Sequence, residues 1–185
     1  MKHVLMINSS PRPQGATQAI LSLMQAELKT LGLSCEIVRL SDYQIGYCLG
    51  CQRCYQTAQC VQRDDMDTLH GAMARADILV LASPSYWGDI TGQMKVFIDR
   101  CTPYCNTHTP HASLPGDKQG YAVALRTGSN PGECLHIIDS IRHFYGHLDI
   151  PCGKHAALLF CGIKDANDIS KTHIGEIQNF ARSIA

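Results

Sequence analysis

The sequence lacks an excess of charge of either sign, because 16 acidic and 16 basic residues balance. Extended nucleic-acid binding needs a basic excess, so the composition argues against nucleic acid as a partner. The balance also counts mildly against a pure electron shuttle, which often steers its docking with net charge. No apolar run approaches the roughly 18 residues of a membrane-spanning helix, and the opening MKHVLMINSS is too short in apolar residues for a signal peptide. We therefore expect a cytoplasmic protein without a membrane span.

Several catalytic and nucleotide-binding patterns are missing as well. The chain contains neither GxGxxG nor the Walker pattern with GK[ST], so a bound dinucleotide pyrophosphate or triphosphate is disfavoured. It has no nucleophile elbow and no recognisable triad. No catalytic side chain is expected, and a bound cofactor would have to supply the chemistry.

Short apolar runs alternate with longer segments of helical period, with no repeat or linker between them. The predicted strands are Val4–Ile7, Cys35–Leu40, Asp77–Ser83, Tyr121–Arg126 and Ala156–Cys161. The predicted helices are Ala16–Leu31, Asp65–Arg75, Gly92–Arg100, Glu133–His147 and Ile169–Ile184. This alternation predicts one α/β domain over residues 1–185, a parallel sheet covered by helices on both faces, with a cysteine-rich loop at about 44–64. Ligands of such sheets bind at the carboxyl ends of the strands.

The loop after the first strand favours a monophosphate. Hydroxyls, one guanidinium and free backbone amides converge there on a helix N-terminus, from Ser9, Ser10, Pro11, Arg12, Gly15, Ala16 and Thr17. Unpaired amides and the helix dipole both attract a dianion. The alternative is an ordinary Ser/Thr-capped helix entry.

Residues 4–17, VLMINSSPRPQGAT, resemble the opening of the NADPH-dependent FMN reductase branch of the flavodoxin-like superfamily. Its usual pattern is a strand, Gly-Ser-Pro-Arg, two variable residues and Gly-Asn-Thr; here Asn8–Ser9 stands near the Gly-Ser, and Ala16 replaces the Asn. A second signature, Pro-x-Tyr and Leu-Lys-x-x-x-Asp-Arg, resembles Pro84–Tyr86 and Met94–Arg100. The resemblance implies a flavodoxin-like three-layer sandwich with strand order 2-1-3-4-5. It also implies bound FMN, whose phosphate Ser9, Arg12, Ala16 and Thr17 would hold.

Two further loops would then hold the flavin ring. Pro84, Ser85, Tyr86, Trp87 and Gly88 follow the third strand and offer aromatic faces and backbone amides for a flat ring. The alternative is that Tyr86 and Trp87 are interface or core aromatics. In the family, the loop after the fourth strand passes the pyrimidine side of the flavin, so Thr127 and Gly128 are expected contacts. A glycine-rich turn is also ordinary turn chemistry.

Ten cysteines in a reducing compartment call for a role other than disulfides. Six are scattered and are expected to be small core residues, namely Cys35, Cys101, Cys105, Cys134, Cys152 and Cys161. The other four, Cys48, Cys51, Cys54 and Cys60, have the spacing C-x2-C-x2-C-x5-C. This compact run suits a [4Fe–4S] cluster better than zinc. It resembles the iron–sulfur flavoproteins, relatives of the same flavin family, while other members with a cysteine-rich loop use it without a cluster.

Together these features predict an FMN-dependent NAD(P)H oxidoreductase. Nicotinamide would deliver hydride to the flavin, and a small-molecule acceptor such as a quinone, a nitro or azo compound or a free flavin would then take its place in a ping-pong cycle. The alternatives are an iron–sulfur flavoprotein that carries electrons to a partner protein, and a redox sensor whose cysteines are the functional groups. The resemblance also implies a homodimer or tetramer.

Overall fold

Five parallel strands form one sheet in the order β2-β1-β3-β4-β5. The computed structural model describes residues 1–185. The strands are β1 (His3–Asn8), β2 (Ser34–Arg39), β3 (Ile78–Pro84), β4 (Gln119–Leu125) and β5 (Ala157–Phe160). The registers place Val4 beside Cys35 and Ile78, so β1 lies inside the sheet. The predicted flavodoxin-like fold and strand order are confirmed.

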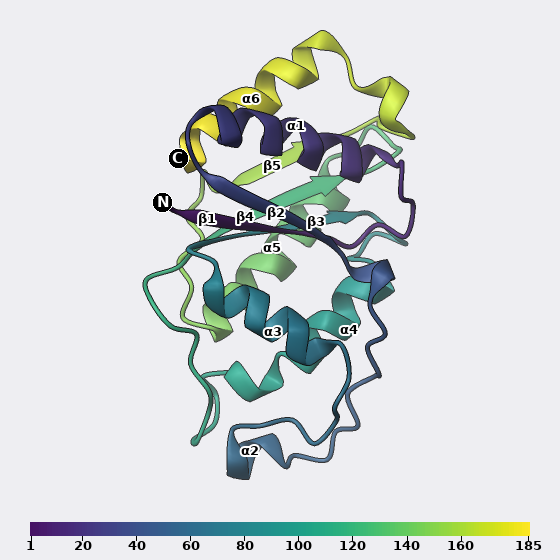
Figure 1. The fold of residues 1–185 in the computed structure, drawn as a ribbon. Coiled ribbons are helices and arrows are strands. Elements are labelled where there is room, and N and C mark those ends of the chain that lie inside the picture. The colour runs from purple at the N-terminus through teal and green to yellow at the C-terminus, as the bar shows by residue number, and fades with distance from the viewer.

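Helices cover both faces of the sheet and make three layers (Figure 1). The helices α1 (Ala16–Thr30) and α6 (Lys171–Ile184) lie side by side on one face. The other face carries α3 (Met66–Arg75), α4 (Gly92–Arg100) and α5 (Gly132–His147). A one-turn helix, α2 (Cys54–Thr57), lies in the cysteine-rich loop, beyond α3 and α4 as seen from the sheet. None of these helices combines the length and apolarity needed to cross a bilayer.

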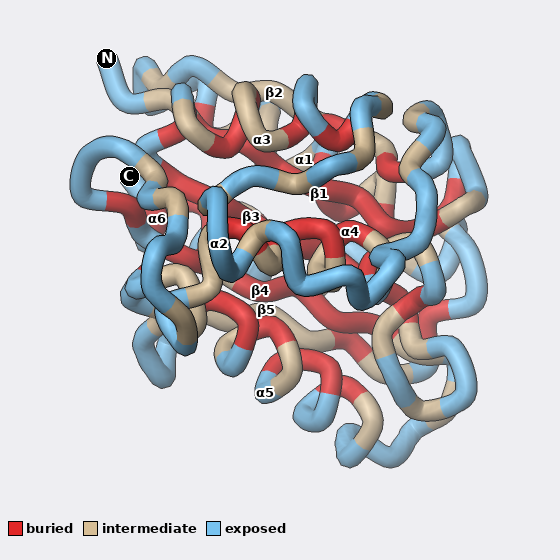
Figure 2. The backbone as a smooth tube through the Cα atoms, turned by 90° about the horizontal axis from the view of Figure 1, so that it is seen from below, coloured by how far each residue is buried: buried red, intermediate tan, exposed pale blue.

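Alternating side chains of the strands feed two separate cores. Leu5 and Ile7 point into the core under α3, α4 and α5, while Val4 and Met6 point into the core under α1 and α6. This alternation follows from the two-residue period of a strand. The buried residues concentrate on the sheet and the inner helix faces, and the outer loops are exposed (Figure 2). The core therefore fixes the sheet and leaves its loops free to build a site.

The observed elements agree with the predicted ones within two residues at each end. The largest shift at a helix is in α6, which begins at Lys171 because Ser170 and His173 form a capping box there. The sequence analysis did not predict α2. Four residues are too few to show a helical period, and the local turn follows from the loop rather than from an apolar face.

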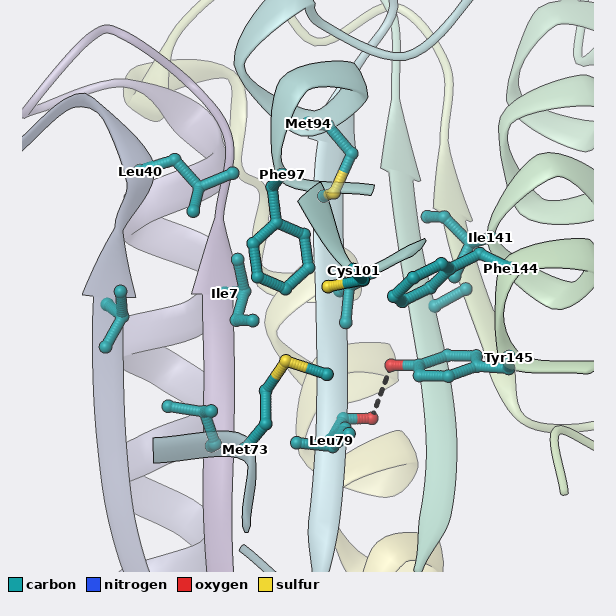
Figure 3. Packing of buried hydrophobic residues seen from close by; sticks show 14 of the residues in the cluster. Ile7, Leu40, Met73, Leu79, Met94, Phe97, Cys101, Ile141, Phe144 and Tyr145 are labelled. Atoms are coloured by element: carbon teal, nitrogen blue, oxygen red, sulfur yellow. Dashed lines mark hydrogen bonds between the residues drawn. The ribbon is translucent and has the colours of Figure 1, made fainter. Parts of the chain in front are cut away.

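Tyr145 joins α5 to the middle of the sheet. Its buried hydroxyl donates to the carbonyl oxygen of Leu79 at 2.9 Å (Figure 3). It also donates to the carbonyl oxygen of Tyr121 at 3.2 Å. The ring lies directly over Gly120, where an added Cβ would come within 2.7 Å of it. We expect Gly120→Ala to destabilise the protein by about 2 kcal/mol, since the buried ring must shift. Urea unfolding measures this.

Gly175 provides the matched control for that substitution. It lies inside α6, and an added Cβ there would meet no atom within 4 Å. Gly175→Ala should raise the free energy of unfolding by up to about 1 kcal/mol, because alanine favours the helix. Equal effects of the two substitutions would contradict this account of the Tyr145 packing.

His70 on α3 gives the fold a dependence on pH. Burial lowers the pKa of His70 from 6.5 to about 4, and its buried Nε2 has no hydrogen-bond partner. Between these two values the unfolded chain binds the proton and the folded chain does not, so stability falls as the pH is lowered from 6.5 to about 4. His70→Leu should flatten the urea midpoint across this window. An unchanged pH profile in the variant would show that another group is responsible.

Candidate functional site

Three loops meet at the carboxyl edge of the sheet, at the ends of β1, β3 and β4. Backbone hydrogen bonds tie the first loop to the second: Ser9 N donates to Ala82 O at 3.0 Å, and Thr91 Oγ1 donates to Ser9 O at 3.1 Å. Ser85 N donates to Leu125 O at 2.7 Å and ties the second loop to the end of β4. The structure thus brings the three predicted loops together.

The first loop presents an uncapped helix N-terminus. Gly15 is the N-cap of α1; no side chain bonds to its amides, and the first turn holds no acidic residue. Ser9 is fully buried, and its Oγ has no hydrogen-bond partner. Ser10, Ala16 and Thr17 are buried beside it. An orphaned hydroxyl next to open amides and a positive helix end is an arrangement that fits an anion.

Arg12 lies over this helix end. Its Cβ would lie 3.1 Å from a Cβ added at Gly15, so a larger residue at position 15 would push Arg12 away slightly. The exposed guanidinium donates from Nη2 to the carbonyl of Lys164 at 2.8 Å. Arg12 therefore places a positive charge at the mouth of the loop and joins it to the segment after β5.

The second loop ends in a tight turn with Trp87 at its tip. Tyr86 and Asp89 exchange two backbone hydrogen bonds, at 2.9 and 3.1 Å. Trp87 and Gly88, between them, both have positive φ, at 56° and 83°. Such a turn usually carries Asn-Gly, and a bulky residue in the first of these positions is strained. Trp87 is fully exposed and Tyr86 is 43% exposed, so the strain presents two aromatic side chains to solvent.

Polar contacts from Glu133 on α5 hold this turn in place, and they were not predicted from the sequence. Glu133 accepts from Ser85 Oγ at 2.5 Å and forms an ion pair with Arg126 Nη2 at 3.0 Å. Arg126 Nη1 also donates to Asn130 O at 2.6 Å. The detectable signal was a glutamate in the first turn of a helix that directly follows a strand-end loop.

The third loop places Thr127 and Gly128 beside this brace. Thr127 is exposed, and a Cβ added at Gly128 would lie 2.5 Å from Nη2 of Arg126. The guanidinium of Arg126 thus packs directly against the Gly128 backbone, and a side chain there would displace it. Gly128 O accepts from Gly162 N at 2.9 Å, which anchors the loop to the end of β5.

The four clustered cysteines surround one small cavity. Cys48, Cys51, Cys54 and Cys60 all line a space of about 30 Å³ next to Arg100. Burial raises the pKa of the Cys54 thiol, and the neighbouring Cys48, Cys60 and Cys51 raise it further. No three His, Cys, Asp or Glu side chains are arranged as a metal site, so the thiols would have to draw closer to bind one. The donor chemistry and the convergence of four thiols fit an iron–sulfur cluster.

Arg100, at the end of α4, is held beside these thiols by Asp64. Burial alone would lower the pKa of Arg100, but the hydrogen bond to Asp64 and the Cys60 thiol outweigh it and raise this pKa. In return, the Arg100 guanidinium lowers the pKa of Asp64 to about 2. The pair is therefore charged throughout the neutral range.

The scattered cysteines are core residues only in part. Cys101 and Cys134 are buried as predicted, and burial raises the pKa of Cys134 to about 12. The other four, Cys35, Cys105, Cys152 and Cys161, are half-buried. None of the ten is in a disulfide.

Comparison with known proteins agrees with the fold. The sequence model of the NADPH-dependent FMN reductases matches residues 2–160. An iron–sulfur flavoprotein of Archaeoglobus fulgidus is 37% identical over 76% of this chain, which spans 62% of that protein's length. One of Methanocaldococcus jannaschii is 33% identical over 77% of this chain and 70% of its own length. The structure of an NAD(P)H:quinone oxidoreductase from Methanothermobacter marburgensis superposes with a TM-score of 0.73 at 16% identity, over 98% of this chain and 96% of that one.

Proposed function

Because the chain belongs to the NADPH-dependent FMN reductase family, in its iron–sulfur flavoprotein branch, we propose that it binds FMN and transfers electrons from NAD(P)H to an acceptor. One observation carries the proposal. The buried Ser9 hydroxyl has no partner and lies in the loop that leads into the uncapped N-terminus of α1. A buried polar group without a partner costs about 1–3 kcal/mol, and a phosphate would satisfy it.

The first loop is proposed to hold the FMN phosphate. The amides of Ala16 and Thr17 and the hydroxyls of Ser9 and Ser10 supply donors, and Arg12 supplies a positive charge at the mouth. The amides belong to an intact helix, so they are oriented before the ligand arrives. Little ordering is then needed on binding, which favours affinity.

The second and third loops are proposed to hold the flavin ring. In the second loop the amides of Trp87 and Gly88 are free to bond a ring edge, because the amides of Ser85 and Tyr86 donate to Leu125 O and Asp89 O and Pro84 has no N–H. Tyr86 and Trp87 add aromatic surface, and Thr127 and Gly128 add free amides from the third loop. Glu133 links these two loops through its contacts with Ser85 and Arg126, so the ring would bind between two loops that are fixed relative to each other. Bound FMN supplies the redox chemistry, accepting a hydride equivalent from the nicotinamide and passing electrons onward.

Trp87 and Tyr86 are exposed, so the proposed flavin site is open to solvent on their side. This favours a cycle in which the nicotinamide nucleotide and the acceptor bind at the same place, one after the other. The oxidised nucleotide leaves, and a small-molecule acceptor of the quinone, nitro, azo or flavin class takes its place. The residues on this face position the reactants against the ring. They carry no acid or base of their own that the cycle requires.

A second candidate rests on the cysteine cavity. Four thiols around one space, together with relatives named iron–sulfur flavoproteins, favour a [4Fe–4S] cluster held by Cys48, Cys51, Cys54 and Cys60. A cluster moves single electrons, whereas a nicotinamide delivers two. With a cluster present, the chain would act as an electron carrier to a partner protein. FMN would accept two electrons and the cluster would pass them on one at a time.

Anaerobic reduction separates these candidates. FMN-loaded protein is mixed with NADPH or NADH, and the flavin band near 450 nm is followed in a stopped-flow instrument. Bleaching within seconds, followed by recovery on adding a quinone, is the expected result for the reductase. A flavin that stays oxidised with both nucleotides while dithionite reduces it would refute the reductase and leave the carrier.

A further inference from the structure

Arg100 is a buried cation on the wall of the four-cysteine cavity. Its side chain is 1% exposed, and arginine is almost never buried to this extent unless its charge is paired. It ends α4 and lines the same cavity of about 30 Å³ as Cys48, Cys51, Cys54 and Cys60. No other arginine or lysine lines that cavity.

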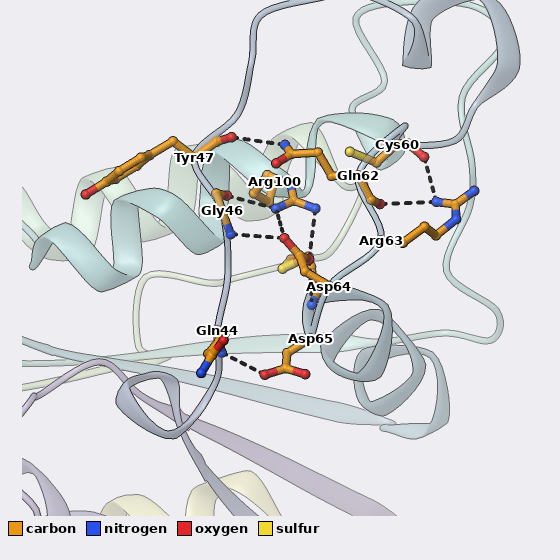
Figure 4. A network of polar contacts seen from close by, with 10 residues as sticks. Gln44, Gly46, Tyr47, Cys60, Gln62, Arg63, Asp64, Asp65 and Arg100 are labelled. Carbon is orange, nitrogen blue, oxygen red and sulfur yellow. Dashed lines mark hydrogen bonds and ion pairs between the residues drawn. The ribbon is translucent and has the colours of Figure 1, made fainter.

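Two fixed contacts hold the guanidinium in place (Figure 4). Nη1 and Nη2 donate to the two carboxylate oxygens of Asp64, at 2.6 and 3.0 Å. Nη1 also donates to the carbonyl of Gly46 at 2.8 Å. Gly46 precedes the first clustered cysteine and Asp64 follows the last, so Arg100 joins both ends of the loop. A guanidinium held at this many points cannot swing out to solvent.

One nitrogen of this guanidinium has no acceptor. The buried Nε has no hydrogen-bond partner, although the other contacts are well formed. Leaving a charged donor unpaired is costly, so a further acceptor is missing. Cys60 lies close enough for its thiol to interact with the guanidinium. The four cysteines line the same cavity as this guanidinium, so an acceptor bound by them would lie beside it.

A four-thiolate iron–sulfur cluster would supply such an acceptor. It is an anion with sulfur atoms that accept hydrogen bonds, and it gains one more negative charge on reduction. Hydrogen bonds to the sulfurs and nearby positive charge favour the reduced form. Asp64, bonded to the same guanidinium, offsets part of that charge.

We propose that Arg100 sets the reduction potential of the cluster, with its guanidinium raising the potential and Asp64 limiting the rise. The inference rests on the proposed cluster and deepens it. Arg100 acts through the cluster and is a positioning and tuning residue. Three observations support this assignment. The side chain of Arg100 is buried beside four thiols, its guanidinium is held by two hydrogen bonds to Asp64, and its Nε has no hydrogen-bond partner.

The experiment is a potentiometric titration of the anaerobically purified full chain, with the reduced cluster followed by electron paramagnetic resonance. Arg100→Gln should lower the ratio of reduced to oxidised cluster at a fixed potential about tenfold, equivalent to about 59 mV for one electron. Asp64→Asn should raise this ratio, because the guanidinium is then uncompensated. Arg63→Gln is the matched control. Arg63 is an exposed cation of the same loop, bonded to the Cys60 carbonyl at 2.7 Å and absent from the cavity wall. It should change the ratio less than twofold.

Iron analysis of each preparation separates the possible failures. Wild-type protein without iron would refute the proposed cluster. Iron-loaded wild type and Arg100→Gln with the same potential would overturn the assignment of Arg100 alone. Should Arg100→Gln not fold, Asp64→Asn decides: a raised potential supports the proposal, and an unchanged one overturns it.

Discussion

Replacing Gln18 with glutamate is expected to weaken FMN binding about thirtyfold, which corresponds to about 2 kcal/mol. Gln18 lies in the first turn of α1, and its Oε1 accepts from Asn8 Nδ2 at 2.9 Å. Glutamate has the same shape and keeps this hydrogen bond, but it places a negative charge beside the proposed phosphate. Like charges a few ångströms apart near a protein surface repel by a few kcal/mol. Titration of apoprotein with FMN, followed by quenching of flavin fluorescence, gives the dissociation constant.

The unliganded variant should not lose stability, since a carboxylate at a helix N-terminus is favourable. Ala26→Glu adds the same charge at an exposed position of α1. That position is about 12 Å further along the helix and beyond the screening length, so FMN affinity should be unchanged there. Similar affinities for Gln18→Glu and the wild type would place the phosphate elsewhere.

Substituting Cys51 by serine is expected to remove the iron–sulfur cluster. Bound iron should fall from about four atoms per chain to nearly none, and the broad absorption near 400 nm should disappear. The flavin bands should remain, because Cys51 lies in the exposed loop around the cysteine cavity and not at the carboxyl edge of the sheet. Iron and sulfide assays on anaerobically purified protein provide the measurement.

Cys35→Ser is the control for this change. Cys35 is a half-buried thiol on β2, outside the cavity, and its loss should leave the iron content unchanged. Iron and absorption that survive in Cys51→Ser would show that Cys51 is not a ligand. Zinc in place of iron in the wild type would favour the structural-metal alternative.

Sequence patterns were sufficient to predict the individual strands because each strand is short, apolar and bounded by turn residues. Ile78–Ala82 is buried along its whole length, as expected for a central parallel strand. The helices follow from apolar residues at helical spacing, such as Ile20, Met24 and Leu28 on α1. The strand order itself came from the family resemblance and not from periodicity, which says nothing about neighbours.

The site was predictable in outline because ligand loops of parallel sheets lie at one edge. The contacts between those loops were not, since they join residues far apart in the chain. Ser85 and Glu133 are 48 residues apart, and Arg100 and Asp64 are 36 apart. Neither pair has a local sequence pattern. The exposure of Trp87 depends on a positive φ that tryptophan rarely adopts, so its position was equally hidden.

The most direct measurement compares FMN with riboflavin in titrations of the same apoprotein. The two ligands share the flavin ring and differ only in the phosphate, which the open amides of α1 and the Ser9 hydroxyl are proposed to bind. FMN should bind at least about a hundredfold more tightly than riboflavin, a difference of about 3 kcal/mol. Equal affinities, or no binding of FMN at all, would contradict it.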